Sequence, residues 1–372
     1  MIPNGFRIGL VGPLPPPSGG MANQTRQLAY LLRQEGVEVE IVQVNAPYRP
    51  QWIRSVRGIR ALFRLIPYMM QLWRTAGRVQ IFHVMANSGW AWHFFAAPAI
   101  WIGKLRRVPM VVNYRGGNAE EFFARSFFWI KPTMRLVDRL IVPSGFLQQI
   151  FARFGLTAEV VPNVIDLERF ARDSAKRTTY TNAPHIIVTR NLEPIYDIGT
   201  ALRSLAIVKN TWPDVRMTIA GSGPEANALV ALTQELGLTN NVTFTGRLDN
   251  EHIALVYQQA DVFVNPSLVD NMPISILEAL ASSVPVVTTD VGGIPFLVEH
   301  DRTAMLVPPC DASAMALALL DLLSNRLKAD RLANAGRDYV QRYTWRNVRE
   351  RLLDIYSGLV MNADKNMAGI VK

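Results

Sequence analysis

The sequence predicts an α/β chain made of two parallel-sheet domains, and three observations carry this prediction. Its 372 residues exceed what one ordinary hydrophobic core organises. Short apolar runs alternate with amphipathic helical stretches along nearly the whole chain, which is typical of parallel sheets covered by helices on both faces. A polar segment from Ala171 to Pro184 divides the alternation into two halves and is the expected linker.

The composition is that of a globular protein, with 49% hydrophobic residues. Cys310 is the single cysteine, so no intrachain disulfide can form, which fits a reducing compartment and a cytoplasmic location. The start of the sequence shows no secretory signal pattern. The most apolar segment, Gly89 to Gly103, is too short to span a bilayer and contains Pro98, so we expect a buried helix there.

The positive charge is concentrated in one part of the first half. The formal net charge is +9, yet the stretch from Ile41 to Ala119 holds eleven Lys or Arg and no Asp or Glu. The rest of the chain therefore carries 9 − 11 = −2. This distribution indicates a localised anionic partner, and nothing in the sequence indicates nucleic acid.

The chain opens with a predicted strand, Arg7 to Val11, followed by a loop rich in Pro and Gly and a helix ending near Gln34. A second strand is expected from Val37 to Val44. Gly19 and Gly20 close the loop at the helix start, where backbone amides without side chains in the way can approach a phosphate. On this evidence alone a simple turn is an equally good interpretation.

A long amphipathic helix is predicted from Gln51 to Trp73, with Pro67 expected to kink or split it. Its apolar residues follow a 4-3-4-3-4-3 spacing, which places them on one face. They are Trp52, Val56, Ile59, Phe63, Ile66, Met70 and Trp73, and the arginines opposite are Arg54, Arg57, Arg60 and Arg64. Two interpretations remain open: a solvated basic face, or a helix that contacts an anionic membrane.

The strand and helix alternation continues to the end of the second half. Predicted strands cover Val79–Val84, Val108–Asn113, Leu140–Val142, His185–Thr189, Arg216–Ala220, Asn241–Thr245, Asp261–Asn265 and Val284–Thr289. Ligands of such sheets bind at the carboxyl ends of the strands. In the second half these ends carry Arg190, the Gly221 to Pro224 turn, Arg247, the loop of Asp270, and the Gly292-Gly293 pair.

The segment from Val264 to Val287 organises the second half, because it combines two carboxylates with a helix start. Asp270 lies in a loop, Pro273 suits a first helical turn, and Glu278 lies about one turn inside the helix. Free amides at the helix start suit a phosphate, and carboxylates accept hydrogen bonds from hydroxyls. A nucleotide sugar needs this combination. The alternative is an Asp270 that caps the helix and a Glu278 that faces solvent.

This segment resembles the signature of the retaining glycosyltransferases of family 4, the glycosyl transferases group 1, which have the GT-B fold. The resemblance lies in Asp270, Pro273, Glu278 to Ala281, and Pro285-Val286-Val287. Residues 141–147 and 161–166 also resemble the family, as does nearly the whole chain, most specifically from Ile187 to Pro308. The resemblance implies two Rossmann-like parallel-sheet domains facing a central cleft. Residues 1–170 would bind the acceptor, 171–344 would bind the donor, and a helix at 345–361 would return to the first domain.

The resemblance also implies roles for individual residues. Arg190, Asp270 and Glu278 correspond to catalytic positions, with Glu278 on the ribose and Asp270 on a sugar hydroxyl. Arg115 and Gly116 lie where the family places residues near the acceptor or the reacting sugar. The implied donor-binding set is Gly19, Gly20, Gly221, Gly223, Arg247, Asn271, Met272, Pro273, Ile274 and Glu278.

The chain departs from the family pattern at three positions. The first acidic residue is Asp270 where the family usually has Glu, and Asn191 to Gly199 holds no Lys, although the family usually pairs Arg190 with one. Arg115 stands where members often have a His, so no catalytic His is assigned, and His83 and His93 are expected to be structural. Phosphate neutralisation is thus expected to rest on Arg190, helix N-termini and a residue that the sequence does not identify.

The sequence therefore predicts a metal-independent, cofactor-free retaining glycosyltransferase that uses a nucleotide diphosphate sugar. Its expected acceptor is lipid-linked or a polysaccharide. The expected location is the cytoplasm, with peripheral attachment to the inner face of the cytoplasmic membrane through Arg54, Arg57, Arg60 and Arg64. Two rival functions stay open: a nucleotide-sugar epimerase of the same fold, and a catalytically silent binding protein.

Overall fold

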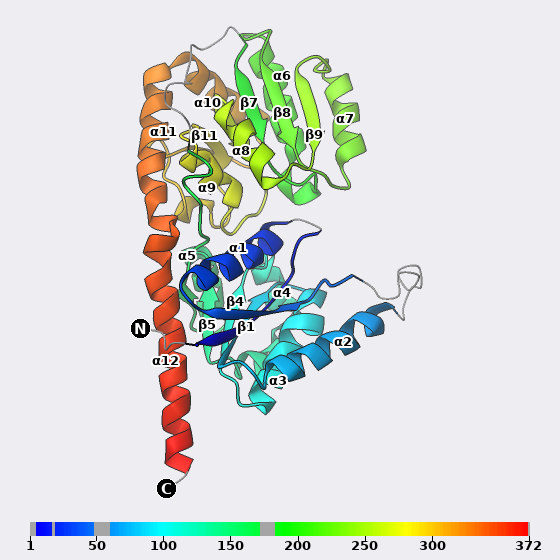
Figure 1. The fold of residues 1–372 in the computed structure, drawn as a ribbon. Coiled ribbons are helices and arrows are strands. Elements are labelled where there is room, and N and C mark those ends of the chain that lie inside the picture. Colours follow the sequence, from blue (N-terminus) through cyan, green and yellow to red (C-terminus); the bar gives the residue numbers. More distant parts are fainter. Residues whose placement is uncertain (1–4, 17–18, 48–59, 172–182, 371–372) are drawn as a thin grey trace. The chain divides into compact units, whose positions relative to one another are not determined.

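A computed structural model describes residues 5–16, 19–47, 60–171 and 183–370 of the chain (Figure 1). The chain forms two compact units. The first unit comprises Met1–Asn163 and Val348–Lys372, and the second comprises Val164–Asn347. Each unit contains its own parallel sheet and its own hydrophobic core, as the repeated alternation predicts.

The first unit is built on six parallel strands in the order β2-β1-β3-β4-β5-β6. β1 and β3 are paired neighbours inside the sheet, and their apolar side chains alternate between the two faces. Val84 enters the core on one face, whereas the neighbouring His83 points to the other. The strands are β1 (Arg7–Gly12), β2 (Glu38–Gln43), β3 (Ile81–Ala86), β4 (Met110–Tyr114), β5 (Arg139–Val142) and β6 (Glu159–Val160).

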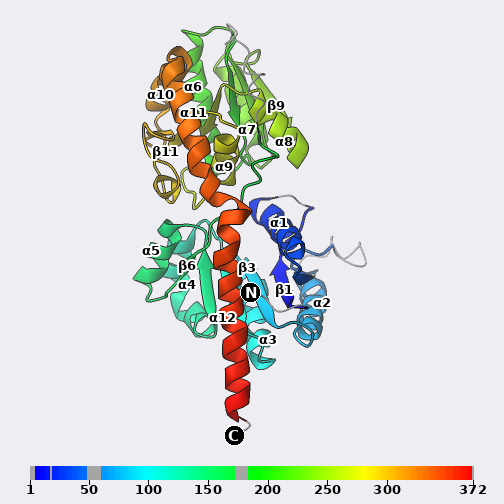
Figure 2. The same cartoon turned by 60° about the vertical axis from the view of Figure 1, so that its left-hand side comes forward.

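Helices cover both faces of this sheet. One face packs against α2, α3, α4 and α5, which share a core with the strands. The long C-terminal helix α12 lies along the sheet of this unit, where Tyr356 contacts Phe6 and His83 (Figure 2). The helices are α1 (Gly20–Gln34), α2 (Arg60–Thr75), α3 (Ala97–Leu105), α4 (Ala119–Met134), α5 (Gly145–Arg153) and α12 (Trp345–Ile370).

The second unit repeats this plan with the strand order β12-β11-β10-β7-β8-β9, again all parallel. The strands β7, β10 and β11 are buried on both faces, so they are mostly apolar in the sequence. They are β7 (His185–Val188), β8 (Arg216–Ala220), β9 (Val242–Gly246), β10 (Val262–Asn265), β11 (Val286–Thr289) and β12 (Met305–Val307).

Two cores fill the two faces of the second sheet. Ile186 and Val188 face one core and Ile187 faces the other, as the two-residue period of a strand requires. One core contains α6 and α10, and the other contains α8 and α9. The helices are α6 (Ile198–Lys209), α7 (Ala226–Glu235), α8 (Asn250–Gln258), α9 (Ile274–Ala281), α10 (Ala312–Ser324) and α11 (Arg326–Val340).

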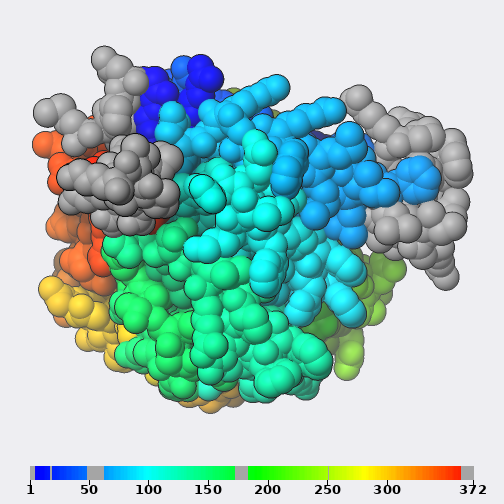
Figure 3. Space-filling model, turned by 90° about the horizontal axis from the view of Figure 1, so that it is seen from below, coloured from blue at the N-terminus to red at the C-terminus, as the bar shows by residue number. Residues whose placement is uncertain are grey.

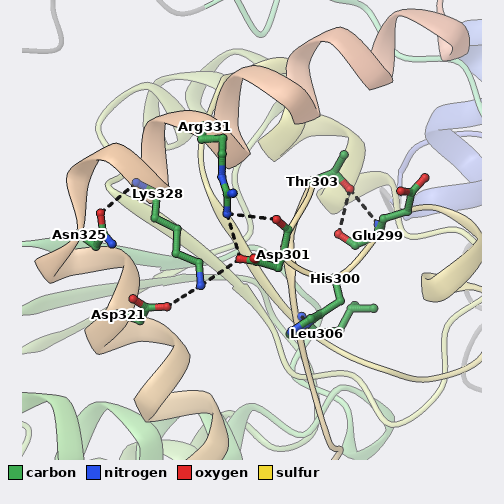
Figure 4. Close-up of polar contacts among 9 residues, drawn as sticks. All are labelled: Glu299, His300, Asp301, Thr303, Leu306, Asp321, Asn325, Lys328 and Arg331. Atoms are coloured by element: carbon green, nitrogen blue, oxygen red, sulfur yellow. Dashed lines mark hydrogen bonds and ion pairs between the residues drawn. The ribbon is translucent and has the colours of Figure 1, made fainter.

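A network of ion pairs fixes the start of α11 (Figure 4). The Lys328 ammonium lies 2.9 Å from Asp301 and 2.8 Å from Asp321, and Arg331 adds a contact of 3.1 Å to Asp301. The Asn325 side chain accepts a hydrogen bond from the Lys328 amide as the helix cap. Since most of these groups are exposed, each pair stabilises the corner only modestly, and burial of Leu332 contributes more.

The boundary between the units differs from the predicted one after residue 170. Ile165 and Phe170 are buried in the core of the second unit. The Ile165 amide also donates to the Tyr343 carbonyl at 3.0 Å. Residues 164–170 therefore belong to the second unit, because their apolar side chains are buried there. Most of the predicted linker, residues 172–182, lies outside the described residues.

The helix predicted from Gln51 is described only from Arg60, so Trp52, Arg54, Val56, Arg57 and Ile59 lie outside the described residues. It continues through Pro67 as one helix, so the predicted split is wrong, and the alternative of a kink stays a prediction. The face of α2 that packs into the core is not the one with the 4-3-4-3-4-3 apolar spacing. Tyr68 and Leu72 pack into the core, and the Tyr68 hydroxyl donates to the Phe95 carbonyl at 2.6 Å.

The apolar face defined by that spacing is largely exposed to solvent. Phe63, Ile66, Met70 and Trp73 are 44–58% exposed. The helix carries two apolar stripes, and helical spacing alone cannot decide which of them meets the sheet. The apolar segment Gly89 to Gly103, which we expected to be a buried helix, is buried only in part. It forms a short π-helix (Trp92–Ala96) and most of α3, and while Trp92 is buried, Trp101 is half exposed.

Candidate functional site

The candidate site lies at the carboxyl edge of the sheet in the second unit. The loop after β7 carries Arg190, and the loop after β10 carries Asp270. β7 and β10 are neighbours in the sheet, although about 75 residues separate them in the chain. The Leu268 amide donates to the Ile195 carbonyl at 2.8 Å, which ties the two loops together. The strand order therefore brings the two predicted catalytic side chains to one place.

Arg190 and Asp270 form an ion pair between Nη2 and Oδ2. Both side chains are largely buried, with 11% and 13% of their surface exposed. Arg190 Nη1 also donates to Ser275 Oγ at 3.2 Å, and the guanidinium lies 4.0 Å from the centre of the Tyr196 ring. The Arg190 Nε–H is buried and has no hydrogen-bond partner among the described residues. One donor of this fixed cation is thus unsatisfied by the described residues.

The environment of Asp270 balances burial against positive partners. Burial raises the pKa of this carboxyl, while the Arg190 charge and the amides of Asn271 and Met272 act to lower that pKa. The same amides belong to the turn that leads into α9, which starts at Ile274 with Pro273 as its N-cap. Asn271 and Met272 are buried, so this turn is packed in place.

Glu278 lies one turn into α9 and is held by a tyrosine. The Tyr257 hydroxyl donates to Glu278 Oε2 at 3.0 Å, and Thr189 Oγ1 lies 2.5 Å from the same hydroxyl. Burial raises the pKa of Glu278 to about 7, against the lowering effects of Tyr257, Arg190 and Arg169. The carboxyl is therefore poised near neutral pH, where a bound ligand that donates hydrogen bonds favours its ionised form.

Four glycines allow the loops of the site to approach one another. A Cβ on Gly221 would lie 1.9 Å from the Arg190 carbonyl oxygen, and one on Gly223 would lie 2.2 Å from that of Leu192. On the other side, a Cβ on Gly293 would lie 1.8 Å from the Asn271 carbonyl oxygen. Gly292 has φ +55° and lies against the Asp270 carbonyl. Gly221 and Gly223 thus position Arg190.

We predict that Gly221→Ala displaces the Arg190 backbone, because the clash is with a carbonyl and not with a flexible side chain. The variant should lose roughly 1–3 kcal/mol of unfolding free energy, as overpacked sites do. Its thermal stabilisation by nucleotide should fall as well. Gly358→Ala is the control, since a Cβ there meets nothing within 4 Å. Equal urea midpoints and equal nucleotide responses in the two variants would show that the close approach does not matter.

The remaining residues that were predicted to bind the sugar donor, Arg247, Gly19 and Gly20, belong to other elements of the chain. Arg247 is exposed and follows β9, an edge strand separated from β7 by β8. Gly19 is the N-cap of α1 in the first unit, in an extended conformation, and Gly20 begins the helix. A Cβ on Gly19 would meet nothing within 4 Å, so no close contact requires glycine there. A donor role for these three residues remains a prediction.

Arg115 and Gly116 lie at the carboxyl end of β4 in the first unit. Arg115 Nε donates to Asn113 Oδ1 at 3.1 Å, and its Nη1 contacts Asn163 Oδ1. A Cβ on Gly116 would lie 2.1 Å from Ser88 Oγ, so this turn also depends on glycine. Both residues therefore stand at the sheet edge where ligands of parallel sheets bind.

The sequence missed the side chains that hold the predicted ones in place. Ser275 and Tyr196 position Arg190, and Tyr257 positions Glu278. Tyr257 lies on α8, some twenty residues before Glu278, where the sequence pattern indicates only an apolar helix face. Ser275 offered a weak signal, because it lies in the first turn of the helix that follows Asp270. Within the part of the chain that is described, no group of three or more His, Cys, Asp or Glu is arranged to hold a metal ion.

Comparison with known proteins gives matches along most of the chain. Residues 18–169 match the model described as Glycosyltransferase Family 4, and residues 170–339 match the one described as Glycosyl transferases group 1. A phosphatidyl-myo-inositol mannosyltransferase of Mycobacterium leprae is 23% identical over 97% of this chain and 99% of its own length. A GDP-mannose-dependent alpha-(1-6)-phosphatidylinositol monomannoside mannosyltransferase of Mycobacterium tuberculosis is 29% identical over 59% of this chain and 62% of its own length.

Solved structures show the same fold. Sucrose-phosphate synthase from Thermosynechococcus elongatus superposes with a TM-score of 0.75 at 20% identity, over 96% of this chain and all of that one. Anabaena HepE in complex with UDP-glucose gives a TM-score of 0.74 at 18% identity, over 95% and 100%. The two six-stranded sheets, the motif that carries Asp270 and Glu278, and the two matching models agree. The chain belongs to the family 4, group 1 glycosyltransferases and consists of the two Rossmann-like domains of the GT-B fold.

Proposed function

We propose that this glycosyltransferase moves a sugar from a nucleotide diphosphate sugar to a lipid-linked or polysaccharide acceptor, with retention of the anomeric configuration and without a metal ion. The observation that carries the proposal is the cluster at the start of α9. It combines the buried Arg190–Asp270 pair, the tyrosine-held Glu278 and the N-terminus of α9. These groups match the hydroxyls and the diphosphate of such a donor.

The cluster assigns a different task to each group. The departing diphosphate gains negative charge as the sugar leaves, and Arg190 with the α9 amides would stabilise that charge without moving. Asp270 orients Arg190 through the ion pair and would accept a hydroxyl of the sugar with its remaining lone pairs. Glu278 would accept hydroxyls of the ribose. No protein nucleophile is part of this proposal.

The test incubates the protein with candidate donors, with and without acceptor, and identifies the products by mass spectrometry. GDP-mannose and UDP-glucose head the panel because proteins similar to this chain are named with them. Transfer only when acceptor is present supports the proposal. A changed free sugar without acceptor would indicate an epimerase, and nucleotide binding without any turnover would indicate a silent binding protein.

A lipid-linked acceptor is supported by the surface of the first unit. α2, α3 and α4 lie next to one another on the face seen in Figure 3, where Arg106 of the α3 C-cap stacks on Trp73 and Trp101 donates to Thr133. Three aromatic side chains of this face, Trp101, Phe128 and Trp129, are at least half exposed. Together with the exposed face of α2 they form what we call the aromatic face. Its residues are Phe63, Ile66, Met70, Trp73, Trp101, Leu105, Phe128 and Trp129.

We propose that the aromatic face attaches the protein to an anionic membrane. Exposed apolar patches of this kind mark interaction sites, and aromatic rings favour the membrane interface. The eleven cationic residues between Ile41 and Ala119 supply about 1 kcal/mol each where they lie near anionic lipid. Arg64 is described and half-buried, while Arg54, Arg57 and the side chain of Arg60 lie outside the description. Among the described residues no helix is long and apolar enough to cross a membrane.

Flotation with vesicles containing anionic lipid tests this attachment. The wild type should float at low salt and release as salt rises, since ionic screening shortens the range of the charges. Changing Arg54, Arg57, Arg60 and Arg64 together to Gln, or Phe63, Ile66 and Met70 together to Ser, should abolish flotation. Leu317→Ser with Leu327→Ser is the control, because both residues are exposed on the second unit. Flotation of the altered proteins at the wild-type level would contradict the attachment.

A further inference from the structure

A series of hydrogen-bonded polar side chains crosses the first unit from α12 to the end of β4. His83 Nδ1 lies 2.6 Å from the Tyr356 hydroxyl, and His83 Nε2 lies 3.1 Å from Asn113 Nδ2. Asn113 Oδ1 then accepts from Arg115 Nε at 3.1 Å. Arg115 Nη1 in turn donates a hydrogen bond to Asn163 Oδ1. The side chains of His83, Asn113, Asn163 and Tyr356 are all buried.

The directions of these hydrogen bonds follow from Arg115, which can only donate. Asn113 therefore presents its carbonyl oxygen to Arg115 and its amide to His83. His83 Nε2 must accept, so its proton lies on Nδ1 and points to Tyr356. Burial and the Arg115 charge lower the pKa of His83 to about 3, which keeps the ring neutral. Both described hydrogen-bond partners of the guanidinium, Asn113 and Asn163, are thus neutral groups.

Arg115 therefore carries a charge that the described residues do not balance. It forms no ion pair with any described carboxylate, whereas Arg190 in the second unit is paired with Asp270. Burial lowers the pKa of Arg115 to about 10, so it remains a cation at neutral pH. Arg115 is half-buried, and charges withdrawn from water are normally paired. A cation that two asparagines hold, and that no described carboxylate pairs with, suits the binding of an anion.

The Arg115 guanidinium also has hydrogen-bond donors that no described residue uses. It has five N–H groups, and the described partners use one on Nε and one on Nη1, which leaves 5 − 2 = 3. The two asparagines fix the plane of the fork, so little conformational freedom is lost when a ligand binds. A planar fork that is held in place suits the oxygens of a phosphate or carboxylate group.

We propose that Arg115 binds an anionic group, a phosphate or a carboxylate, of the acceptor at the carboxyl end of β4. The inference rests on the proposed function, since it deepens the acceptor side of that reaction. Asn113 and Asn163 act as positioning residues, and His83 and Tyr356 fix the orientation of Asn113. The neighbouring Gly116 keeps this turn close to Ser88. An arginine in place of the family's usual histidine thus makes this acceptor site select for charge.

The experiment uses inorganic phosphate as the probe on the full chain with ¹⁵N-labelled arginine. The Arg115 Nε signal is assigned as the one that Arg115→Gln removes. It should shift and saturate on titration with phosphate, while chloride at equal ionic strength should leave it in place. Arg139→Gln is the matched control, because Arg139 is a partly exposed arginine at the start of the neighbouring strand β5. A signal that responds equally to chloride, or to neither salt, would overturn the proposal.

Two further measurements separate ligand binding from a structural role. In chloride, Arg115→Gln should melt at or above the wild-type temperature, because it removes an unbalanced charge. Phosphate should raise the melting temperature of the wild type and of Arg139→Gln more than that of Arg115→Gln. A lower melting temperature for Arg115→Gln in chloride together with a wild-type shift in phosphate would mean that Arg115 only holds Asn113 and Asn163, which overturns the proposal.

A nucleotide titration identifies the source of the anion. If the acceptor carries it, Arg115→Gln should bind the nucleotide diphosphate as the wild type does, while its affinity for phosphate falls about tenfold or more. An equal loss for the nucleotide would assign Arg115 to the donor and overturn the acceptor assignment. The phosphate response needs no turnover. A chain that shows this response but no sugar transfer would therefore refute the proposed function and leave the anion site standing.

Discussion

Glu278→Gln is expected to weaken nucleotide binding and at the same time to stabilise the unliganded protein above pH 7. Burial raises the pKa of Glu278 from 4.5 to about 7 in the folded chain. Between these values the folded protein holds a proton that the unfolded chain has released, so stability falls as pH rises through this window. The penalty is complete above pH 7 and amounts to about 3 kcal/mol at most. Gln keeps the shape, carries no charge and removes the penalty.

Urea unfolding between pH 4 and pH 8 measures the first half of this prediction. The difference between Glu278→Gln and the wild type should be small at pH 4 and should grow in favour of the variant towards pH 8. Glu235→Gln is the control, because Glu235 is an exposed residue on α7. A constant difference across the range would show that Glu278 titrates normally in the folded protein.

Calorimetry with nucleotide and nucleotide sugar measures the second half. Each lost charge-assisted hydrogen bond to the ribose should cost roughly 1.5–3 kcal/mol. Affinity for both ligands should fall by similar factors, since they share the ribose. The two halves together describe a group kept for function at a cost in stability. Unchanged affinity for both ligands would remove Glu278 from the ribose site.

The sequence predicted the sheet strands well because they are buried on both faces. Residues 185–188 and 262–265 consist mainly of Ile, Val and Phe and are bounded by turn residues, so a strand is the secondary structure that fits them best. β6 and β12 were missed because they are two and three residues long. The same limit applies at boundaries: Ile165 and Phe170 read as the end of one domain, yet their burial places them in the next.

The orientation of surface helices was not predictable from periodicity. α2 and α3 are apolar on more than one side, and the apolar spacing in the sequence does not show which side packs against the sheet. The structure buries Tyr68 and Leu72 and leaves Phe63 and Trp73 in solvent. The exposed apolar side chains thus support the proposed membrane attachment along with the arginines.

The candidate site was predictable as a set of loops but not as a set of contacts. Arg190, Asp270 and the glycines follow strand ends, and parallel strands bring such ends together. The ion pair between Arg190 and Asp270 depends on strand order, which local pattern does not fix. Tyr257 and Asn163 could not be recognised from the sequence, because their positions on a helix and in a loop are ordinary. Only the folded structure brings them to Glu278 and Arg115.

Removing one member of the Arg190–Asp270 pair is expected to damage the protein more than removing both charges. Arg190→Met leaves the Asp270 carboxylate largely buried without its cation, and Asp270→Asn leaves Arg190 without its anion. Breaking a buried pair costs about 3–5 kcal/mol, whereas replacing both partners by neutral groups is often tolerated. The double variant should therefore be more stable than the sum of the single changes implies. Additive losses in urea unfolding would show that the two side chains do not act as a unit.

Turnover should not follow stability: the double variant should regain stability, but its kcat should stay as low as that of Arg190→Met. Arg190 is the one cation that the described cluster offers to a departing diphosphate, and the usual lysine is absent from residues 191–199. A group that acts where charge develops lowers kcat when removed, by about 10²–10³ for one such donor. Arg190→Met and the double variant should both show this loss in kcat, with a smaller change in donor affinity. A double variant that regains stability but not turnover would separate the role of Arg190 in the reaction from its role in the fold. If kcat is unchanged and only KM rises, Arg190 binds the donor without stabilising the transition state, and the cation for the leaving group must be sought outside this cluster.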